Sequence, residues 1–385
     1  MSLPPPAPAV PRPAPPPAAA PSTAAGMAPE PARVLVCDDS VVIRAAIARM
    51  LESDPEVRVV SRVGNGQLAV DAVVRQRVDV VVLDIEMPVL DGLSALPLLL
   101  RADPTLRVIM ASTLTTRGAD IALRALRLGA ADYLPKPSTA QIQDDSFRNE
   151  LLAKVKGLAR LHRRARLPAA SPSASPPPLS LRPLPRQSPL LLAIGSSTGG
   201  PQALFSLVQG LGTTVPVPVV LTQHMPATFT PLLAEHLTRI GGLPCAEAQH
   251  GERLRAGRIY LAPGNRHLLV EGTPEALVAR LSDAPAENFC RPSVDPMLRS
   301  AGAACGGRVL VVMLTGMGRD GLAGTRQVVD AGGAALAQDE ATSVVWGMPG
   351  AIAQAGLCHQ VLPLPALPAK VLELLRASRP AARRA

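Results

Sequence analysis

The stretch Leu190–Pro201, Leu-Leu-Leu-Ala-Ile-Gly-Ser-Ser-Thr-Gly-Gly-Pro, decides how the second half of the chain folds. Its apolar run predicts a buried strand that breaks at Gly195, and the Gly-Gly-Pro that follows predicts the start of a helix. A serine hydroxyl on such a turn lies beside the free backbone N–H groups of a helix N-terminus. Those groups can stabilise an oxyanion or bind a phosphate, and a glycine-rich turn can also merely pack. The stretch alone leaves these three roles open.

The composition predicts two domains with aliphatic cores. The chain has 385 residues, of which 47% are hydrophobic and 2% aromatic, so Val, Leu, Ile and Ala must fill the interior. Apolar runs such as Val78–Leu83 and Val309–Leu314 are far shorter than the ~20 residues that a membrane span needs. The N-terminus lacks the charged start and continuous apolar segment of a signal peptide, so we expect a cytoplasmic protein.

Cysteine spacing and charge distribution exclude several classes of site. The five cysteines are scattered without Cys-x-x-Cys spacing, so we expect buried, inert thiols rather than disulfides or a zinc site. The net charge of +9 lies almost entirely in residues 151–188, which contain Lys and Arg and no acid. This segment predicts a solvated, self-repelling linker, with contact to acidic surfaces as the less favoured role. Since its basic residues form no recognition helix, we expect no nucleic-acid partner.

The first half of the chain changes character near residue 32. Residues 1–31 are mostly Pro and Ala and predict a disordered tail. Short apolar runs then alternate with helical stretches, which predicts a doubly wound parallel α/β sheet. The expected strands are Arg33–Cys37, Val57–Val63, Val78–Leu83, Arg107–Ala111 and Ala131–Leu134. The expected helices are Ser40–Ser53, Gly66–Arg77, Leu93–Arg101 and Ala119–Leu128.

Three carboxylates follow the ends of these predicted strands. Asp38 and Asp39 follow the first strand, and Asp84 follows the third. Because the C-terminal ends of parallel strands share one edge of a sheet, we expect the three side chains to converge. Crowded carboxylates raise one another's pKa unless a cation joins them, and Mg²⁺ prefers oxygen ligands. With Lys136 at the end of the last strand, the set suits phosphoryl transfer to a carboxylate; solvated acids at strand ends are the alternative.

The segment from about residue 33 to residue 146 resembles the receiver domain of two-component response regulators, with its flavodoxin-like fold. The resemblance rests on Val-Cys-Asp38-Asp39-Ser, Leu-Asp84-Ile-Glu-Met-Pro, Asp91-Gly92 and Leu-Pro-Lys136-Pro137. It implies that Asp84 accepts a phosphoryl group from a histidine kinase. It also implies a Mg²⁺ site whose ligands are Asp38, Asp39, Asp84 and the backbone carbonyl of Glu86. It further implies a set of residues that respond to phosphorylation, namely Lys136, Ser112 (next to Thr113) and Tyr133.

A second strand–turn–helix series begins near Ser188. The apolar runs Val215–Thr222 and Arg308–Leu314 each end in a polar loop, and these loops carry His224 and Asp320. A serine, a histidine and an aspartate at strand C-termini can perform acyl transfer, in which the histidine deprotonates the serine and the aspartate orients the histidine. A chance trio remains the alternative. The other histidines are expected on the surface or in the core: His162, His236, His250, His267 and His359.

Residues from about 190 to 375 look like the catalytic domain of chemotaxis protein-glutamate methylesterases, with a Rossmann-like fold. The shared motifs are Gly-Ser-Ser-Thr-Gly-Gly-Pro, Thr-Gln-His-Met-Pro, Ala-Pro-Gly-Asn-Arg-His, Arg-Pro-Ser-Val-Asp-Pro, Leu-Thr-Gly-Met-Gly-Arg-Asp-Gly and Gln-Asp-Glu-Ala-Thr-Ser-Val-Val-Trp-Gly-Met-Pro-Gly. The family nucleophile directly precedes Thr-Gly-Gly, which selects Ser197 over Ser196. The resemblance implies His224 as general base, Asp320 as its orienting partner, and the N–H groups of Thr198 and Met317 as the oxyanion hole. Trp346 is expected in the core.

The two resemblances imply a tail at residues 1–31, a receiver domain at 32–150, a basic Pro-rich linker at 151–187 and a methylesterase domain at 188–380. The chain is expected to hydrolyse glutamyl methyl esters on methyl-accepting chemotaxis receptors and to deamidate receptor glutamines, with Mg²⁺ for phosphorylation and no cofactor for the esterase. It would touch membranes only through those receptors. A response regulator that only binds partners, and a nucleotide-binding regulator that uses the glycine-rich turn, are the alternatives.

Overall fold

The structure, a computed structural model, describes residues 30–112, 115–136, 145–166, 179–183 and 187–376. The predicted tail at residues 1–31 lies almost wholly outside the described residues. Residues 31–385 form one compact unit. Among the described helices, none has both the length and the apolar character needed to cross a membrane.

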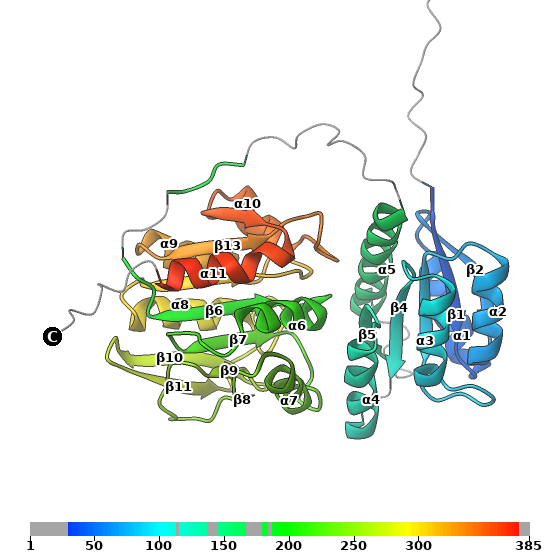
Figure 1. Ribbon diagram of the computed structural model, residues 1–385, viewed down its shortest axis with the longest axis horizontal. Coiled ribbons are helices and arrows are strands. Elements are labelled where there is room, and N and C mark those ends of the chain that lie inside the picture. Colours follow the sequence, from blue (N-terminus) through cyan, green and yellow to red (C-terminus); the bar gives the residue numbers. More distant parts are fainter. Residues whose placement is uncertain (1–29, 113–114, 137–144, 167–178, 184–186, 377–385) are drawn as a thin grey trace, which may run out of the picture. The chain divides into compact units, whose positions relative to one another are not determined.

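A parallel sheet of five strands forms the first half of this unit (Figure 1). Its order is β2-β1-β3-β4-β5. The strands are β1 (Ala32–Cys37), β2 (Val57–Val63), β3 (Val80–Asp84), β4 (Arg107–Ser112) and β5 (Asp132–Pro135). Every residue of β3 is buried, which is why its sequence is an unbroken apolar run rather than an alternating one. The predicted α/β fold is confirmed here.

Helices cover both faces of this sheet. They are α1 (Val41–Glu52), α2 (Gly66–Arg75), α3 (Gly92–Ala102), α4 (Thr116–Arg127) and α5 (Asp145–Arg166). Successive side chains of a strand point to opposite faces. Val34 and Val36 therefore pack with α1 and α5, whereas Leu35 and Cys37 pack with α2, α3 and α4. Asp91 caps α3 by accepting a hydrogen bond from the N–H of a residue in its first turn.

Helix α5 corrects the predicted boundary between the receiver-like domain and the linker. The prediction ended the domain at residue 150, but α5 continues to Arg166. Leu151, Val155 and Leu158 are buried on the same face of the sheet as α1. Their spacing of three and four residues is that of an amphipathic helix, although Lys154 and Lys156 lie between them and made the segment resemble a charged linker. Residues 151–166 are thus part of the first half rather than a linker.

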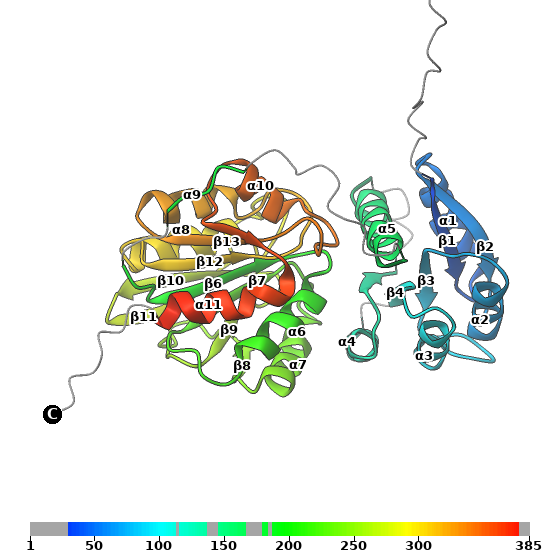
Figure 2. The same ribbon diagram turned by 45° about the horizontal axis from the view of Figure 1, so that its top comes forward.

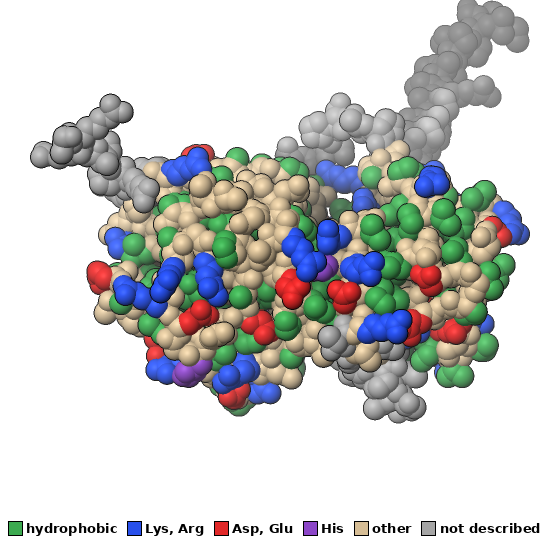
Figure 3. Space-filling view, turned by 60° about the horizontal axis from the view of Figure 1, so that its bottom comes forward, with side chains coloured by type: hydrophobic (Ala, Val, Ile, Leu, Met, Phe, Trp, Pro, Cys, Tyr) green, Lys and Arg blue, Asp and Glu red, His purple; other side chains and the backbone are tan. Residues whose placement is uncertain are grey.

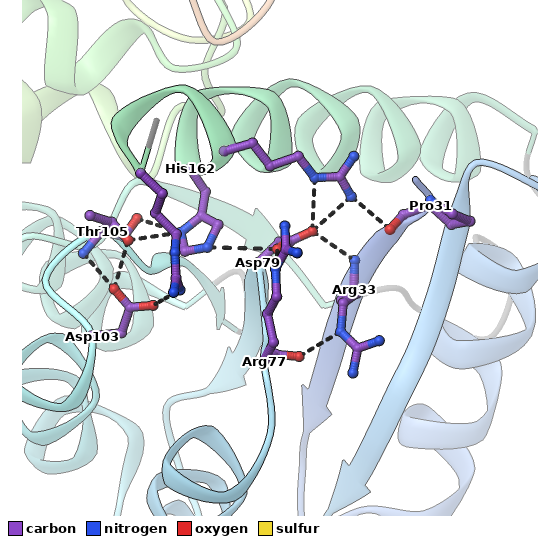
Figure 4. A network of polar contacts seen from close by, with 9 residues as sticks. Pro31, Arg33, Arg77, Asp79, Asp103, Thr105 and His162 are labelled. Carbon is purple, nitrogen blue, oxygen red and sulfur yellow. Dashed lines mark hydrogen bonds and ion pairs between the residues drawn. The ribbon is translucent and has the colours of Figure 1, made fainter. Parts of the chain in front are cut away.

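Most of the cations of α5 are paired, contrary to the predicted self-repelling spacer. Arg163 donates to Asp79 Oδ2 from Nε at 3.2 Å and from Nη2 at 2.8 Å. Figure 4 shows Asp79 at the centre of this network, between Arg33 and His162. His162 is buried, with Nδ1 2.9 Å from the carbonyl oxygen of Thr105 and Nε2 3.6 Å from Asp79 Oδ1. Further ion pairs are Lys156–Asp54, Lys154–Asp132, Arg160–Glu340 and Arg166–Asp103. On the face drawn in Figure 3, Lys and Arg side chains are likewise interspersed with Asp and Glu.

The second half contains a parallel sheet of seven strands in the order β14-β13-β12-β6-β7-β9-β8 (Figure 2). The strands are β6 (Leu191–Ser196), β7 (Val219–Gln223), β8 (Cys245–Glu247), β9 (Ile259–Leu261), β12 (Val309–Met313), β13 (Ala334–Gln338) and β14 (Gln360–Leu362). An antiparallel hairpin, β10 (His267–Thr273) and β11 (Ala276–Ser282), lies outside it. Strand β7 begins later than predicted because Pro216 and Pro218 lack the N–H that a ladder requires.

Helices again pack on both faces of this sheet. They are α6 (Gly200–Leu211), α7 (Thr230–Gly241), α8 (Val294–Ala304), α9 (Leu322–Asp330), α10 (Met348–Gln354), the 3₁₀ helix η2 (Leu364–Ala366) and α11 (Leu367–Arg376). From β6 the chain builds the sheet toward β7, and from β12 it builds toward β13 and β14. The strand order therefore reverses between β6 and β12. In doubly wound sheets such a reversal opens a crevice at the strand C-termini, where active sites lie.

Candidate functional site

The predicted carboxylates converge at the C-terminal edge of the first sheet. One oxygen from each of Asp38, Asp39 and Asp84 lies within 4.8 Å of the others. The Nζ of Lys136 lies 2.7 Å from Asp84 Oδ2 and 3.1 Å from Asp38 Oδ2. One lysine does not balance three carboxylates, and Asp38 and Asp84 are buried. A set of oxygen donors with excess negative charge fits Mg²⁺.

Burial and neighbouring charges shift the pKa values of this cluster. Burial raises the pKa of Asp84 from 3.8 to about 6 and Asp38 adds to the rise, although Lys136 opposes it. Burial favours the neutral form of Lys136, but the two carboxylates outweigh this effect and raise its pKa. Burial also raises the pKa of the Cys37 thiol to about 12, so this cysteine is inert, as expected. The ionised Asp84 therefore gains from any added cation.

The remaining receiver residues lie near this edge to different degrees. The N–H of Glu86 donates to Asp84 Oδ1 at 3.4 Å, which places Glu86 beside the cluster; the metal-binding role of its carbonyl stays a prediction. Ser112 is buried at the end of β4, and its carbonyl oxygen accepts from the N–H of Lys136 at 2.7 Å. Thr113 lies outside the described residues. Tyr133 is buried on β5 and stacks on Phe229 with ring centroids 4.7 Å apart.

The serine turn lies at the crevice of the second sheet, and the two serines differ in their surroundings. Ser196 is fully buried, and its hydroxyl donates to Gln223 Oε1 at 2.7 Å. Ser197 is only half-buried. The Nε2 of Gln223 donates to the carbonyl oxygens of Ser197 and His224 at 3.0 and 3.1 Å, so Gln223 joins the serine turn to the histidine loop. These contacts favour Ser197 as the residue that meets a substrate.

His224 and Asp320 form a largely buried pair, with side chains 13% and 2% exposed. Nε2 of His224 lies 2.7 Å from Asp320 Oδ2. Burial alone would raise the pKa of Asp320, but His224 and the hydrogen-bond donors around it lower it. Burial alone would lower the pKa of His224, and the Asp320 carboxylate reverses this and raises it. Asp320 also accepts hydrogen bonds from the Asn288 and Ser293 side chains and from the backbone N–H groups of Val294 and Asp295. A carboxylate with this many donors stays ionised and fixes the orientation of the imidazole.

The N–H groups of Thr198 and Met317 are the two that the sequence predicts to form an oxyanion hole. Neither donates a hydrogen bond within the part of the chain that the structure describes. The N–H groups of their neighbours Ser197 and Gly316, by contrast, donate to backbone carbonyls. A Cβ on Gly316 would lie 3.0 Å from the Ser197 Cβ, so glycine allows the Met317 loop to approach the serine turn. The oxyanion roles stay a prediction.

The structure does not join all three members of the predicted triad. Within the described residues, the Ser197 hydroxyl makes no hydrogen bond to His224. Because Nε2 of His224 faces Asp320, Nδ1 is the nitrogen left to act on the serine. Nδ1 instead faces Sγ of Cys290 at 3.4 Å. Catalytic hydrogen bonds are often absent before substrate binds, so this geometry does not remove Ser197 from the assignment.

Contacts from the first half reach the serine turn. The N–H of Gly199 donates to Asp132 Oδ2 at 3.1 Å, and Gln202 donates to backbone carbonyls of Leu126 and Ala130. Lys154 holds the same Asp132 carboxylate at 3.0 Å. The predicted phosphoacceptor half and the predicted esterase half thus contact each other through β5.

Sequence reasoning missed several residues of this site. Gln223, Ser293, Asn288 and Cys290 each contact a member of the proposed triad. Ser293 lay within the quoted Arg-Pro-Ser-Val-Asp-Pro motif, and Gln223 within Thr-Gln-His-Met-Pro, so these motifs held an available signal. The other five histidines were expected on the surface or in the core. His250 is exposed and the remaining four are buried. Trp346 is half-buried and packs against the second core.

Comparisons with known proteins identify the family of the chain. The chain matches the CheB methylesterase family over residues 192–371 and the response regulator receiver domain family over residues 34–144. A protein-glutamate methylesterase/protein-glutamine glutaminase of Azospirillum brasilense is 55% identical over 382 residues, which cover 94% of each chain. One of the group 2 operon of Rhodospirillum centenum is 56% identical and covers 87% of this chain and 92% of the relative.

Two solved structures from Thermotoga maritima match the two halves separately. The CheB methylesterase catalytic domain is 38% identical, with a TM-score of 0.47, and covers 49% of this chain and 100% of that one. The CheB response regulator domain is 37% identical, with a TM-score of 0.32, and covers 34% of this chain and 98% of that one.

Proposed function

Because the chain belongs to the family of protein-glutamate methylesterase/protein-glutamine glutaminases that carry a receiver domain, we propose that it hydrolyses γ-glutamyl methyl esters on methyl-accepting chemotaxis receptors. The same site would deamidate receptor glutamines. The reaction belongs in the cytoplasm, where the phosphoryl donor, a chemotaxis histidine kinase, has its ATP. Contact with the membrane is indirect, through the receptors.

The observation that carries the proposal is the His224–Asp320 pair beside the Ser197 turn. The 2.7 Å contact and the donors around Asp320 hold the imidazole in one orientation, with Nδ1 free of the carboxylate. A regulator that only binds partners has no need for a buried, fully satisfied acid–histidine pair at the C-terminal crevice of a sheet. A nucleotide site would need positive charges near the phosphate. The N–H of Gly199 in this turn instead donates to a negatively charged aspartate, Asp132.

The chemistry follows from these positions. Ser197 Oγ attacks the ester carbonyl while Nδ1 of His224 takes its proton, which requires the Cys290 thiol to yield its place. The N–H groups of Thr198 and Met317 hold the oxyanion of the tetrahedral intermediate. His224 then gives the proton to the departing methoxide, so methanol leaves and an acyl-enzyme forms. Water, deprotonated by His224, releases the glutamate carboxylate and regenerates Ser197. Deamidation differs only in that ammonia leaves.

Control by phosphorylation uses the other site. Asp84 is the proposed acceptor, and bound Mg²⁺ would supply charge that neutralises the transferring phosphoryl oxygens. Asp38, Asp39 and Asp84 would hold this ion. Lys136, now on two carboxylates, would move to the phosphoryl group, and the change would reach β5 and its contact with Gly199. Before phosphorylation, by contrast, the receiver restrains the esterase through this contact.

The test is methanol release from methylated receptors of the same organism. The wild-type chain should release methanol, and the release should rise when kinase, ATP and Mg²⁺ are supplied. The isolated esterase reaction should continue in EDTA, because its proposed residues include no metal ligand set. Absence of methanol release by both phosphorylated and unphosphorylated chain would reject the proposed enzyme and favour a binding regulator.

A further inference from the structure

A turn beside the proposed catalytic pair exposes a phenylalanine completely. Glu287 and Cys290 exchange both backbone hydrogen bonds, at 3.1 and 2.9 Å, which closes a hairpin with two central residues. These residues, Asn288 and Phe289, have φ values of 53° and 62°. The Phe289 side chain is 104% exposed.

This conformation is unfavourable for the residue that adopts it. Two successive positive φ values are the pattern of a type I′ turn, which asparagine tolerates first and glycine fills best second. A bulky side chain at positive φ is strained, and a phenyl ring in water contributes nothing to the core. The chain has only four phenylalanines. Folding therefore gives no reason for an aromatic residue at this position, and backbone strain of this kind gathers at functional sites.

The turn is held rigidly against the active site. The Asn288 amide donates to Asp320 Oδ1 at 2.8 Å and to Asp295 Oδ2 at 3.0 Å. The Arg299 guanidinium holds Glu287 through two hydrogen bonds, at 2.6 and 2.7 Å. Cys290 faces Nδ1 of His224. The phenyl ring thus protrudes from a fixed turn whose two neighbouring residues, Asn288 and Cys290, contact Asp320 and His224.

A second apolar side chain protrudes on the serine side of the site. Met317, in the loop that contacts the serine turn through Gly316, is 38% exposed. The scissile ester stands at the end of a glutamyl side chain on a polypeptide. When Ser197 reaches that ester, apolar groups that protrude near the reacting residues meet the flanking residues of the polypeptide rather than the ester.

We propose that Phe289, beside the His224–Asp320 pair, together with Met317, beside the serine turn, is the apolar contact that binds the receptor segment flanking the glutamyl ester. This inference rests on the function proposed above and adds the residue that selects a polypeptide substrate over a free ester. Phe289 contributes to substrate binding and takes no part in proton transfer.

The test compares two substrates with the full chain, activated by kinase and ATP. One is methylated receptor in membranes; the other is the γ-methyl ester of N-acetylglutamate α-methylamide, which has the same ester without flanking residues. Phe289→Ala should raise KM for the receptor about tenfold at unchanged kcat, since a partly buried ring contributes about this factor. The ratio of kcat/KM for receptor to that for the small ester should fall by the same factor. Phe289→Tyr should restore it.

Two further variants separate binding from folding. Phe289→Gly relieves the backbone strain, so it should melt no lower than wild type and still show the raised receptor KM. Val74→Ala removes an exposed apolar side chain of α2, which is 71% exposed, and should leave both substrates unaffected. An unchanged receptor KM in Phe289→Ala, or equal losses on both substrates, would overturn the inference. Failure of the wild-type chain on both substrates would instead reject the proposed function.

Discussion

The backbone N–H of Gly199 donates a hydrogen bond to the carboxylate of Asp132, 3.1 Å away. Gly199 precedes α6 with a φ of 73°, so the carboxylate lies at the N-terminal end of a helix, where free N–H groups and the helix dipole favour an anion. Ser197, two residues earlier, belongs to the same turn. The proposed nucleophile is therefore held in place partly by a residue of the receiver-like sheet.

Replacing Asp132 should loosen this restraint. Asp132→Asn keeps the size of the side chain but removes the charge that strengthens its hydrogen bond by about 1–1.5 kcal/mol. Methanol release by the unphosphorylated chain should rise, by roughly tenfold at most, because a restrained equilibrium shifts by the energy removed. Asp71→Asn, an exposed acid on α2, serves as control. Equal basal rates for Asp132→Asn and wild type would show that this contact does not restrain the esterase.

Removing the first half should have a larger effect. A fragment that starts near Ser188 lacks β5 and α5 and should demethylate receptors faster than the unphosphorylated full chain at matched concentrations. Full-length Asp84→Asn should stay at its low basal rate in the presence of kinase and ATP, because the acceptor carboxylate is gone. A fragment no faster than the unphosphorylated whole would contradict restraint by the receiver and would favour activation on the receptor array.

The two serines of the turn should respond differently to substitution. Ser197→Ala should lower turnover by several orders of magnitude, as removal of a triad nucleophile does. Ser196→Ala loses a buried hydrogen bond to Gln223 and should cost about 1 kcal/mol of stability while most activity remains. Methanol release and thermal unfolding distinguish the two losses. If Ser196→Ala abolished turnover and Ser197→Ala spared it, the assigned register would be off by one residue.

The sheets and the strand-end carboxylates were predictable because each rests on local sequence. Unbroken apolar runs such as β3 give the strands, and parallel topology brings Asp38 and Asp84 to one edge without knowledge of helix packing. The same rule brought His224 and Asp320 together at the C-terminal crevice of the second sheet.

The features that could not be predicted from the sequence depend on contacts between segments that are distant in the chain. Helix α5 was predicted as a linker because it contains many Lys and Arg residues and the acids that pair with them, such as Asp79 and Asp103, lie far away in the sequence. Asn288 and Cys290 reach the His224–Asp320 pair from a turn in which the positive φ of Phe289 follows from no local propensity. The Asp132–Gly199 contact needs both sheets in place before it exists.

The hydrogen bonds and ion pairs that join α5 to Asp79 should contribute substantially to the free energy of unfolding of the first half. Asp79 is fully buried and accepts from Arg163 and from the N–H of Arg33. Asp79→Ala removes the acceptor of the Arg33 N–H and of Arg163 Nε, while Arg163 Nη2 keeps the Pro31 carbonyl, so it should cost about 2–4 kcal/mol, between the loss of a buried hydrogen bond and that of a buried ion pair. Glu52→Gln, in a surface pair with Arg62, should cost about 0–1 kcal/mol. Urea unfolding measures both; equal costs would show that the network stabilises little.

The raised pKa of Asp84 should make stability depend on pH in a definite direction. Its pKa is about 6 in the folded chain against 3.8 for an exposed carboxyl, so the folded state binds more protons between about pH 4 and pH 6. Stability therefore falls as pH rises through that window, and the cost is fully present above about pH 6. Asp84→Asn has no such cost and should be more stable than wild type at pH 8 by about 1–2 kcal/mol, after screening by solvent is allowed for. The free energies of unfolding of the two chains should converge below pH 4.

Mg²⁺ should raise the melting temperature of wild type at pH 8 more than that of Asp84→Asn, because the ion neutralises the same carboxylates. Calorimetry of both chains in EDTA and in Mg²⁺ measures these differences. An Asp84→Asn chain that melts at or below the wild-type temperature at pH 8 in EDTA would show that Lys136 already compensates the buried charge.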